Sequence, residues 1–310
     1  GMAYSVALDS IEVYDPANAT WTELTTTLAQ PRTDASMVVD VAAGTAWFLG
    51  GRTATAYLSS IEQITALDLG AETATVTTLA GQMLSPARAY AQTLVLGDGT
   101  WLIIGGQSGS STYSGGVDLF DPATSTCVAK SPMAAERSQF AAVLLDDGDV
   151  LVVGGRNSNR LNSVERYDVP TNQWQTVAPM TASGRTSHAA VWRESTGTVI
   201  AVGGLDATAT LVKTAEEYDP ASDTWSAVDS LNDTRASHQL AFFDDGTILA
   251  YGGLVAGQFR TGTEYLRDIE LVTGWLDTPA TAVEVASPAA MADAESYHIQ
   301  VRSVDQAGNV

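Results

Sequence analysis

Pairs of adjacent glycines end five apolar segments of this chain at nearly regular intervals. The pairs are Gly50-Gly51, Gly105-Gly106, Gly154-Gly155, Gly203-Gly204 and Gly252-Gly253. Their second glycines lie 55, 49, 49 and 49 residues apart in the 310-residue sequence. A period near 50 residues is typical of repeat proteins, whose units bury their apolar faces by stacking on one another. The chain must therefore fold as a series of similar units.

The residues before each glycine pair predict two strands and a tight turn. Seven residues before each second glycine stands another glycine, where a hairpin turn needs a positive backbone φ. These turn glycines are Gly44, Gly99, Gly148, Gly197 and Gly246. Apolar, β-branched runs such as 151–153 and 199–202 follow them and indicate buried strands. An arginine opens the preceding strand of each unit: Arg32, Arg88, Arg137, Arg185 and Arg235.

A third strand follows the glycine pair and ends in an aromatic residue and an aspartate. Tyr167-Asp168 and Tyr218-Asp219 are examples, and a tryptophan follows each tyrosine after seven residues. Turn-forming residues fill the interval, so we predict a fourth strand that contains the tryptophan. Each unit is then four antiparallel strands joined by short turns. No segment shows the apolar periodicity of a helix.

This unit resembles the kelch repeat of galactose-oxidase-like propellers. The match consists of an arginine that opens strand one, a glycine pair that closes strand two, a tyrosine that closes strand three and a tryptophan in strand four. It covers nearly the whole chain. The resemblance implies an all-β fold, a β-propeller of four-stranded antiparallel blades around a central channel. One blade cannot bury both of its faces alone, so the blades must stack.

We expect six blades in a single domain that spans residues 1–310. Five complete units begin at the five arginines. Segment 11–24 supplies a third and a fourth strand, and segment 291–310 resembles a first strand. Residues 291–310 and 1–27 together would form most of a sixth blade, which closes the ring and removes exposed sheet edges. Glu295 replaces the arginine there, and the segment also resembles a late strand of a fibronectin-type or immunoglobulin-like module, which would need more residues than follow the fifth unit.

The composition is strongly acidic. Asp and Glu number 36 against 15 Lys and Arg, which gives a formal net charge of −21. Nucleic acid and anionic membrane surfaces are therefore disfavoured as partners, and most of the acidity is expected to be solubilising surface charge. The alternative is a partner that is basic or cation-bound. No apolar run approaches the ~20 residues that span a membrane. We expect a monomer.

Cys127 is the only cysteine, so no disulfide can form within the chain. It occupies the tryptophan position of a fourth strand, where we expect a small buried apolar residue rather than a reactive thiol. Scarce cysteine suits a cytosolic protein as well as an exported bacterial one. The compartment stays open, with a periplasmic or extracellular location in a bacterium as one option.

The three histidines, His188, His238 and His298, each lie three residues after the arginine position of their unit. The spacing places them at one level of neighbouring inner strands. Three imidazoles that converge on a channel could bind zinc, copper or iron. The kelch resemblance implies instead a histidine that packs or bonds locally, and neighbouring blades could hold the rings too far apart to share a metal. We favour the packing role and predict no metal and no cofactor.

The five arginines admit two roles. Guanidinium groups that bond carbonyls or carboxylates between blades would be structural. Guanidinium groups that point into the channel mouth would bind an anionic ligand. Because all five share one repeat position, the structural role is favoured.

The resemblance to kelch propellers implies two sets of ligand-facing residues. One set follows the glycine pairs: Arg52, Gln107, Arg156, Asn157 and Asp206. The other follows the strand-one arginines: Asp34, Tyr90, Gln139, Ser187, Ser237 and Tyr297. Both sets vary between blades, as a binding face does. Their mixture of arginines, amides, hydroxyls and tyrosines suits a sugar, or an acidic peptide whose carboxylates pair with Arg52 and Arg156.

Our leading hypothesis is a non-catalytic kelch propeller that binds a protein or a carbohydrate on the loops between strands two and three. The alternative is a sugar-processing enzyme such as a sialic-acid mutarotase-like isomerase. Its candidate catalytic groups are His188, His238, His298, Arg185, Arg235 and Glu295. A metal-dependent enzyme that uses the three histidines is a third reading. A galactose-oxidase copper site is disfavoured because the sole cysteine lies at an inter-blade position.

Overall fold

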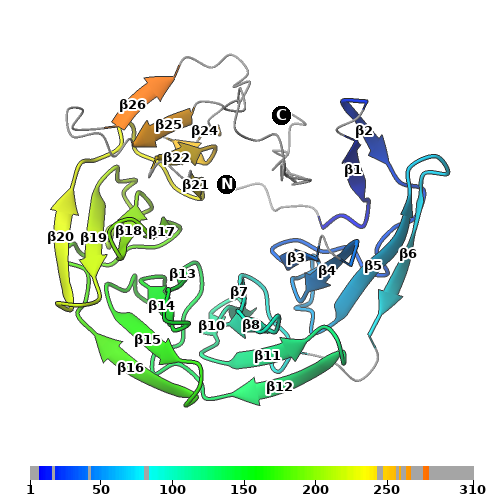
Figure 1. Ribbon diagram of the computed structural model, residues 1–310, viewed down its shortest axis with the longest axis horizontal. Helices are drawn as coiled ribbons and strands as arrows, with labels where there is room; N and C mark the ends of the chain where they lie inside the picture. The colour runs from blue at the N-terminus through cyan, green and yellow to red at the C-terminus, as the bar shows by residue number, and fades with distance from the viewer. Residues whose placement is uncertain are drawn as a thin grey trace.

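The chain folds into antiparallel sheets arranged around a central axis. The computed structural model describes residues 7–15, 18–40, 43–79, 84–242 and 247–255, with the strand segments 258–259, 263–266 and 275–278. Within these ranges five sheets have four strands each, and Figure 1 shows them side by side as blades. The predicted all-β propeller is confirmed. No helix in the described part of the chain is long and apolar enough to cross a membrane.

We number the five blades in chain order. Blade one comprises β3 (Ser36–Asp40), β4 (Thr45–Leu49), β5 (Ile61–Asp68) and β6 (Thr73–Thr78). Blade two comprises β7 (Gln92–Val95), β8 (Trp101–Ile104), β11 (Val117–Asp121) and β12 (Thr126–Lys130). Blade three comprises β13 (Ala141–Leu144), β14 (Val150–Val153), β15 (Val164–Asp168) and β16 (Gln173–Val177). Blade four comprises β17 (Ala189–Arg193), β18 (Thr198–Val202), β19 (Ala215–Asp219) and β20 (Thr224–Val228). Blade five comprises β21 (Gln239–Phe242), β22 (Ile248–Tyr251), β25 (Thr263–Leu266) and β26 (Trp275–Thr278).

Three short hairpins complete the described strands. At the N-terminus β1 (Glu12–Asp15) pairs with β2 (Thr20–Glu23), as the sequence predicts for a third and a fourth strand. In blade two β9 (Gln107–Gly109) pairs with β10 (Thr112–Tyr113). In blade five β23 (Leu254–Val255) pairs with β24 (Gln258–Phe259). The last two hairpins extend loops between strands two and three.

Alternate residues of strand two pack against the two neighbouring blades. In β14, Val150 and Val152 join the apolar cluster shared with blade two, whereas Leu151 and Val153 join the cluster shared with blade four. All four side chains are fully buried. A strand covered on both faces must be apolar at every position, which is why the glycine pairs end continuous apolar runs.

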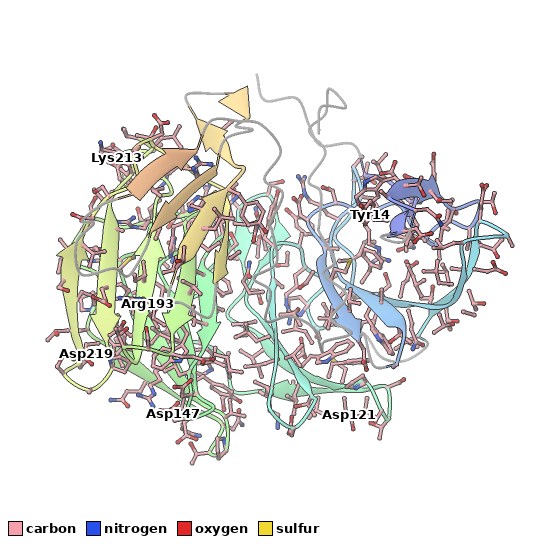
Figure 2. All side chains as sticks on the ribbon, turned by 45° about the horizontal axis from the view of Figure 1, so that its top comes forward. Tyr14, Asp121, Asp147, Arg193, Lys213 and Asp219 are labelled. Carbon is pink, nitrogen blue, oxygen red and sulfur yellow. The ribbon has the colours of Figure 1, made fainter. Side chains whose placement is uncertain are left out.

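The longer loops and the tight turns lie at opposite ends of the blades. The loops between strands two and three of blades one to four, residues 52–60, 107–116, 156–163 and 205–214, lie at one end, and we call this surface the loop face. The tight turns lie at the other end, where Asp121, Asp147 and Asp219 are grouped along the lower edge in Figure 2. Lys213 lies on the loop face, near the upper edge of the same view.

A buried arginine joins the strands of each complete blade. In blade three Arg137 donates from Nη1 to the carbonyl oxygens of Gly154 at 2.8 Å and Ser163 at 3.0 Å. Its Nη2 donates to Oε1 of Glu165 on β15 at 2.5 Å. Glu165 also accepts the main-chain N–H of Ala134, which lies just before the arginine. Burial lowers the pKa of Arg137, while the Glu165 carboxylate acts in the opposite direction.

The same ion pair recurs in blades one, two and four, and main-chain carbonyls of the arginines accept N–H groups from neighbouring blades. The equivalent pairs are Arg32–Glu62, Arg88–Asp118 and Arg185–Glu216. The N–H of Gly155 donates to the carbonyl of Arg185 at 2.7 Å, so blade three is bonded to blade four. We expected the guanidinium groups to bond between blades. They bond within one blade, because the carboxylate comes from strand three of the same sheet, and only the main chain crosses to the next blade.

The second glycine of each pair lies against the start of strand one of its own blade. Gly155 has a φ of +92°, which only glycine adopts without strain. A Cβ atom at Gly155 would lie 2.6 Å from Cβ of Phe140 and 2.8 Å from the carbonyl oxygen of Ser138. The position therefore requires glycine both for its backbone conformation and for the close approach.

Loss of one buried partner should be far more costly than loss of an exposed one. Arg137→Met leaves the Glu165 carboxylate buried without its cation, and we expect the free energy of unfolding to fall by about 3–5 kcal/mol. Arg166→Met removes a partly exposed arginine from Asp147 and Asp149 and should cost less than about 1 kcal/mol. Urea denaturation of the two variants measures both values. An equal fall in the free energy of unfolding in the two variants would contradict the central role of the buried Arg137–Glu165 pair.

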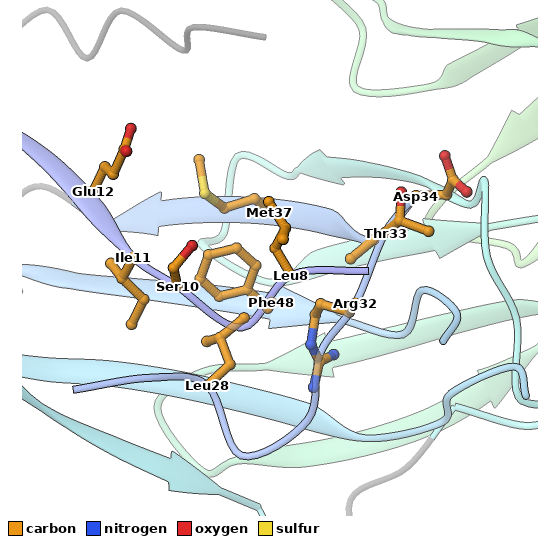
Figure 3. A pocket seen from close by; sticks show the side chains of 11 residues that line it. Leu8, Ser10, Ile11, Glu12, Leu28, Arg32, Thr33, Asp34, Met37 and Phe48 are labelled. Carbon is orange, nitrogen blue, oxygen red and sulfur yellow. The ribbon is translucent and has the colours of Figure 1, made fainter. Parts of the chain in front are cut away.

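The β1–β2 hairpin covers one face of blade one only in part. Ile11 and Leu28 pack on this blade, but Phe48 is half-buried and Met37 is 40% exposed. A cavity of about 320 Å³ lies among these side chains and Leu8 (Figure 3). First and second strands of a further blade would fill this space. Segment 291–310, which we expect to supply the first strand, lies outside the described residues, so the sixth blade and the single domain over 1–310 stay predictions.

Deletion of residues 291–310 tests the sixth blade. If this segment forms its first strand, its removal uncovers apolar surface beside blade one and lowers the Tm measured by differential scanning calorimetry. The intact chain is the reference at the same pH and concentration. An unchanged Tm and an unchanged heat capacity of unfolding would show that the segment is not part of the ring.

Candidate functional site

A ring of left-handed residues surrounds the channel mouth on the loop face. The residue two positions after each strand-one arginine has a φ of 53° to 57°: Asp34, Tyr90, Gln139, Ser187 and Ser237. Main-chain N–H groups in this ring donate to the preceding blade, as Tyr90 does to Asp34 at 2.9 Å and Ser187 does to Gln139 at 2.9 Å. This conformation costs a non-glycine residue roughly 1–3 kcal/mol, which the bonded ring offsets.

The two predicted sets of ligand-facing residues lie beside each other. Arg156, which follows a glycine pair, is bridged to Ser138 on one side and to Arg160 on the other. Arg52 is bridged in the same way to Thr33 and Tyr57. The residue directly after the strand-one arginine, Thr33 or Ser138, therefore pairs with the first residue of the loop and links that loop to the ring of left-handed residues. The described residues of the second set are half-buried, except for Ser237, which is exposed.

Arg52, Asp34 and Tyr90 form a polar cluster between blades one and two. Arg52 donates from Nε to Asp34 at 2.7 Å and from Nη2 to the Tyr90 hydroxyl at 3.0 Å. Burial raises the pKa of Tyr90 to about 12, with a further contribution from the Asp34 carboxylate. Burial lowers the pKa of Arg52, but the bond to Asp34 and the Tyr90 and Asp34 charges leave it raised overall. The Arg52 guanidinium thus already has a carboxylate partner.

Arg156 and Arg160 have a different environment. The Arg156 guanidinium carbon lies 5.9 Å from the ring centroid of Tyr113, which belongs to the loop of blade two. Among the described residues neither arginine lies within ion-pairing distance of a carboxylate. The buried Nε of Arg160 has no hydrogen-bond partner there. The loop of blade three therefore carries two arginines that form no ion pair within the described part of the chain, although the charge of Arg160 contributes to the lowered pKa of Asp206.

Tyr57 and Tyr113 were not predicted as site residues. Each stands where a loop between strands two and three returns toward the channel, and both are half-buried. Burial raises the pKa of Tyr57, and the charges of Asp34 and Tyr113 act in the same direction while Arg52 opposes them. An aromatic residue six or seven positions after the second glycine is the sequence signal that could have identified them.

Three predicted ligand residues shape their own loops. Gln107 donates from Nε2 to the carbonyl of Gly109 at 2.7 Å. Asn157 accepts the N–H of Asn159 at 2.9 Å. Asp206 accepts the N–H groups of Thr208 and Thr210, and the Thr208 hydroxyl bond is the main cause of its lowered pKa. These side chains lie on the predicted surface, but their polar atoms are partly occupied within the loop.

The described histidines pack in the interior. A Cβ atom on Gly203 would lie 2.8 Å from Cε1 of His238, and Phe140 has the same relation to Gly105. The ring nitrogens of His188 and His238 are buried without a hydrogen-bond partner among the described residues. Burial is the main cause of a pKa of about 3 for His238, and it also holds the pKa of His188 well below its ordinary value.

This burial bears on the catalytic and metal hypotheses. Arg185 and Arg235 are interior as well, and both donate to a carbonyl of the glycine pair of their own blade. No group of three potential metal ligands occurs among the described residues. His298, Glu295 and Tyr297 lie outside the described residues. The described members of the catalytic set are therefore buried in the interior, where the two arginines donate to main-chain carbonyls of their own blades.

Acid should destabilise the fold through the buried histidines. The unfolded-state pKa of histidine is about 6.5, so the unfolded chain gains protons below that pH, whereas His238 in the folded chain does not until about pH 3. The contribution of His238 to the free energy of unfolding is complete above pH 6.5. Below pH 6.5 it falls by up to about 1.4 kcal/mol for each pH unit. His238→Phe, which introduces the residue that blade three has at the equivalent position, should remove this loss. Urea titrations at pH 7 and pH 5 compare the two proteins, and parallel pH profiles would contradict the assignment.

Comparison with known proteins agrees with this geometry. A family model described as the Attractin/LZTR1 beta-propeller matches residues 46–266, more than half of the chain. Kelch-like protein 34 from Homo sapiens is 34% identical over 107 residues. These residues are 34% of this chain, and the match spans only 16% of that protein's length. With its repeated arginines, glycine pairs and four-stranded blades, the chain belongs to the Attractin/LZTR1 family of kelch-type β-propellers.

Proposed function

We propose that the chain is a non-catalytic interaction module that binds a partner protein on the loop face. Kelch-type propellers typically bind proteins, which supports this class of function. The observation that carries the proposal is the concentration of tyrosine and arginine around the channel mouth. Tyr57, Tyr90, Tyr113, Arg52 and Arg156 contact or influence one another across three blades.

Tyrosine and arginine suit this role for physical reasons. They are enriched at the energetic centres of protein interfaces, because each combines a large contact area with polar groups that can bond at its end. Cation–π and hydrogen-bond contacts already hold Arg52 on Tyr90 and Arg156 near Tyr113. A partner would therefore meet side chains that lose little further conformational freedom on binding.

The charge distribution also favours this face. With a net charge of −21, most of the surface repels acidic partners, whereas the loop face carries Arg52, Arg156 and Arg160. The opposite end of the blades carries acidic turns (Figure 2). Because the described histidines and strand-one arginines are interior, no described residue supports the sugar-processing enzyme in the same way.

A paired substitution tests the proposed surface. We expect Tyr57→Ser with Tyr113→Ser to weaken partner binding about 30-fold or more, since two interfacial aromatics are truncated. Val128→Ser is the control, because Val128 is 55% exposed on the outermost strand of blade two. Proteins captured by the wild type and the control but lost by the double variant would be purified, and their Kd measured by calorimetry. Binding that is insensitive to the double variant would contradict the assignment of the loop face.

A further inference from the structure

We propose that the open edge of β1 binds a strand of a partner protein, which becomes the second strand of the sheet that β1 and β2 begin. The partner strand carries a basic residue and ends in two glycines. In this mode of recognition main-chain hydrogen bonds provide affinity and alternate side chains provide specificity. The surface differs from the tyrosines and arginines of the loop face, so the inference goes beyond the proposed function and does not depend on it.

β1 has a strand on one side only in the described part of the chain. It pairs with β2, whereas the third strand of every complete blade lies between two others. The Ile11 carbonyl accepts the N–H of Leu24, next to β2, at 2.8 Å. Main-chain groups of successive residues point to opposite sides of a strand, so those of Ser10, Glu12 and Tyr14 point to the open edge. An edge of this kind accepts a further strand.

Blade one presents an incompletely covered apolar face beside this edge. Phe48 of β4 is half-buried, although the residues at its position in the next three blades are fully buried: Ile103, Val152 and Ala201. Leu151 and Val153 of strand two pack with Ala201 in the cluster between blades three and four. An equivalent strand would fill the cavity of about 320 Å³ beside Phe48 (Figure 3). Because exposed apolar patches mark interaction sites, we expect an apolar strand there.

The repeat also defines how the partner strand ends. The first glycine of each pair lies against the carbonyl of the arginine that opens the next blade. A Cβ atom on Gly154 would lie 2.6 Å from the carbonyl oxygen of Arg185, and the pairs of blades one, two and four repeat this relation. Arg32, the corresponding arginine of blade one, lines the cavity. The glycine pairs at this repeat position in residues 1–310 all belong to blades one to five, so we assign the pair that fits against Arg32 to a partner.

Glu12 favours a basic residue in the partner strand. The equivalent carboxylates of the first four blades are buried beside arginines: Glu62, Asp118, Glu165 and Glu216. Glu12 is exposed and lies directly opposite the exposed Glu23, and neither forms an ion pair with a described residue. Like charges so placed destabilise a strand pair, and a cation on the next strand would offset their repulsion. Segment 291–310, the expected first strand, has Glu295 where the other units have arginine, so the cation is assigned to the partner.

A labelled peptide tests this site. The probe is a fluorescein-labelled dodecapeptide that contains Val-Leu-Arg-Val-Gly-Gly, a copy of residues 150–155 with arginine in place of Val152, the residue that pairs with Glu165. We expect saturable binding to the intact chain by fluorescence polarisation, and slower hydrogen exchange at the β1 amides. A peptide with alanines in place of the glycines should bind at least ten-fold more weakly, because a Cβ atom would meet the Arg32 carbonyl.

An exchange of charges locates the peptide beside Glu12. Glu12→Lys should raise the Kd of the arginine peptide roughly five-fold or more. A peptide with glutamate in place of the arginine should bind Glu12→Lys more tightly than it binds the wild type. Glu194→Lys is the control, because Glu194 is also an exposed carboxylate and lies on blade four. Tyr57→Ser with Tyr113→Ser should leave the Kd unchanged, and each variant's Tm should stay near that of the wild type.

The outcomes separate this inference from the proposed function. Failure of the peptide to bind the intact chain, or equal Kd values for the glycine and alanine peptides, would overturn the strand site and leave the loop-face proposal intact. A Kd that rises in the tyrosine double variant but not in Glu12→Lys would place the peptide on the loop face instead. Binding seen only after deletion of residues 291–310 would show that the chain's own segment occupies the edge. A dimer in sedimentation velocity that dissociates on addition of the peptide would assign the edge to a second copy.

Discussion

The buried arginine of strand one is the interaction on which the rest of this propeller depends. Its guanidinium group binds the end of strand two and the carboxylate of strand three, so three strands are fixed to one side chain. The carboxylate in turn accepts main-chain N–H groups that lead into strand one. A charge this deeply buried would be prohibitive alone, and it is tolerated because nearly every donor has an acceptor. The pair specifies the geometry of the blade more than it adds net stability.

This interaction also positions the functional surface. The arginine carbonyl accepts an N–H from the preceding blade, and two residues later the backbone enters the left-handed ring around the channel mouth. The same pattern of interior bonds recurs from blade to blade. The side chains of the ring and of the adjoining loops are therefore not needed to hold the strands of a blade together. They can differ between blades, as Tyr90 and Ser187 do at equivalent positions. A repeated interior therefore supports a surface that does not repeat.

The sequence was sufficient to predict the four-stranded unit because glycines, arginines and aromatics recur at fixed offsets. The interior role of the arginines was also predicted, but not that the ion pair stays within one blade, since the partner carboxylate has no conspicuous motif of its own. Of the three histidines, the two described ones, His188 and His238, pack in the interior at the position that Phe140 has in blade three. Tyr57 and Tyr113 were missed because the kelch resemblance implies ligand-facing residues beside the glycine pairs and the arginines, whereas these tyrosines stand six and seven positions after the second glycine.

The same limit explains why Arg156 and Arg52 were grouped together although their surroundings differ. Both follow a glycine pair, and nothing in the sequence indicates that Asp34 already occupies Arg52. Whether an arginine is free to bind a ligand depends on the carboxylates that neighbouring blades bring near it, and that is a property of the folded ring. Arg160 shows the converse, because it lies outside both predicted sets, yet the loop places it opposite Arg156. In a chain so rich in acidic residues, the absence of an ion pair from both of these arginines in the described part of the chain is a property of the folded ring that their sequence positions do not reveal.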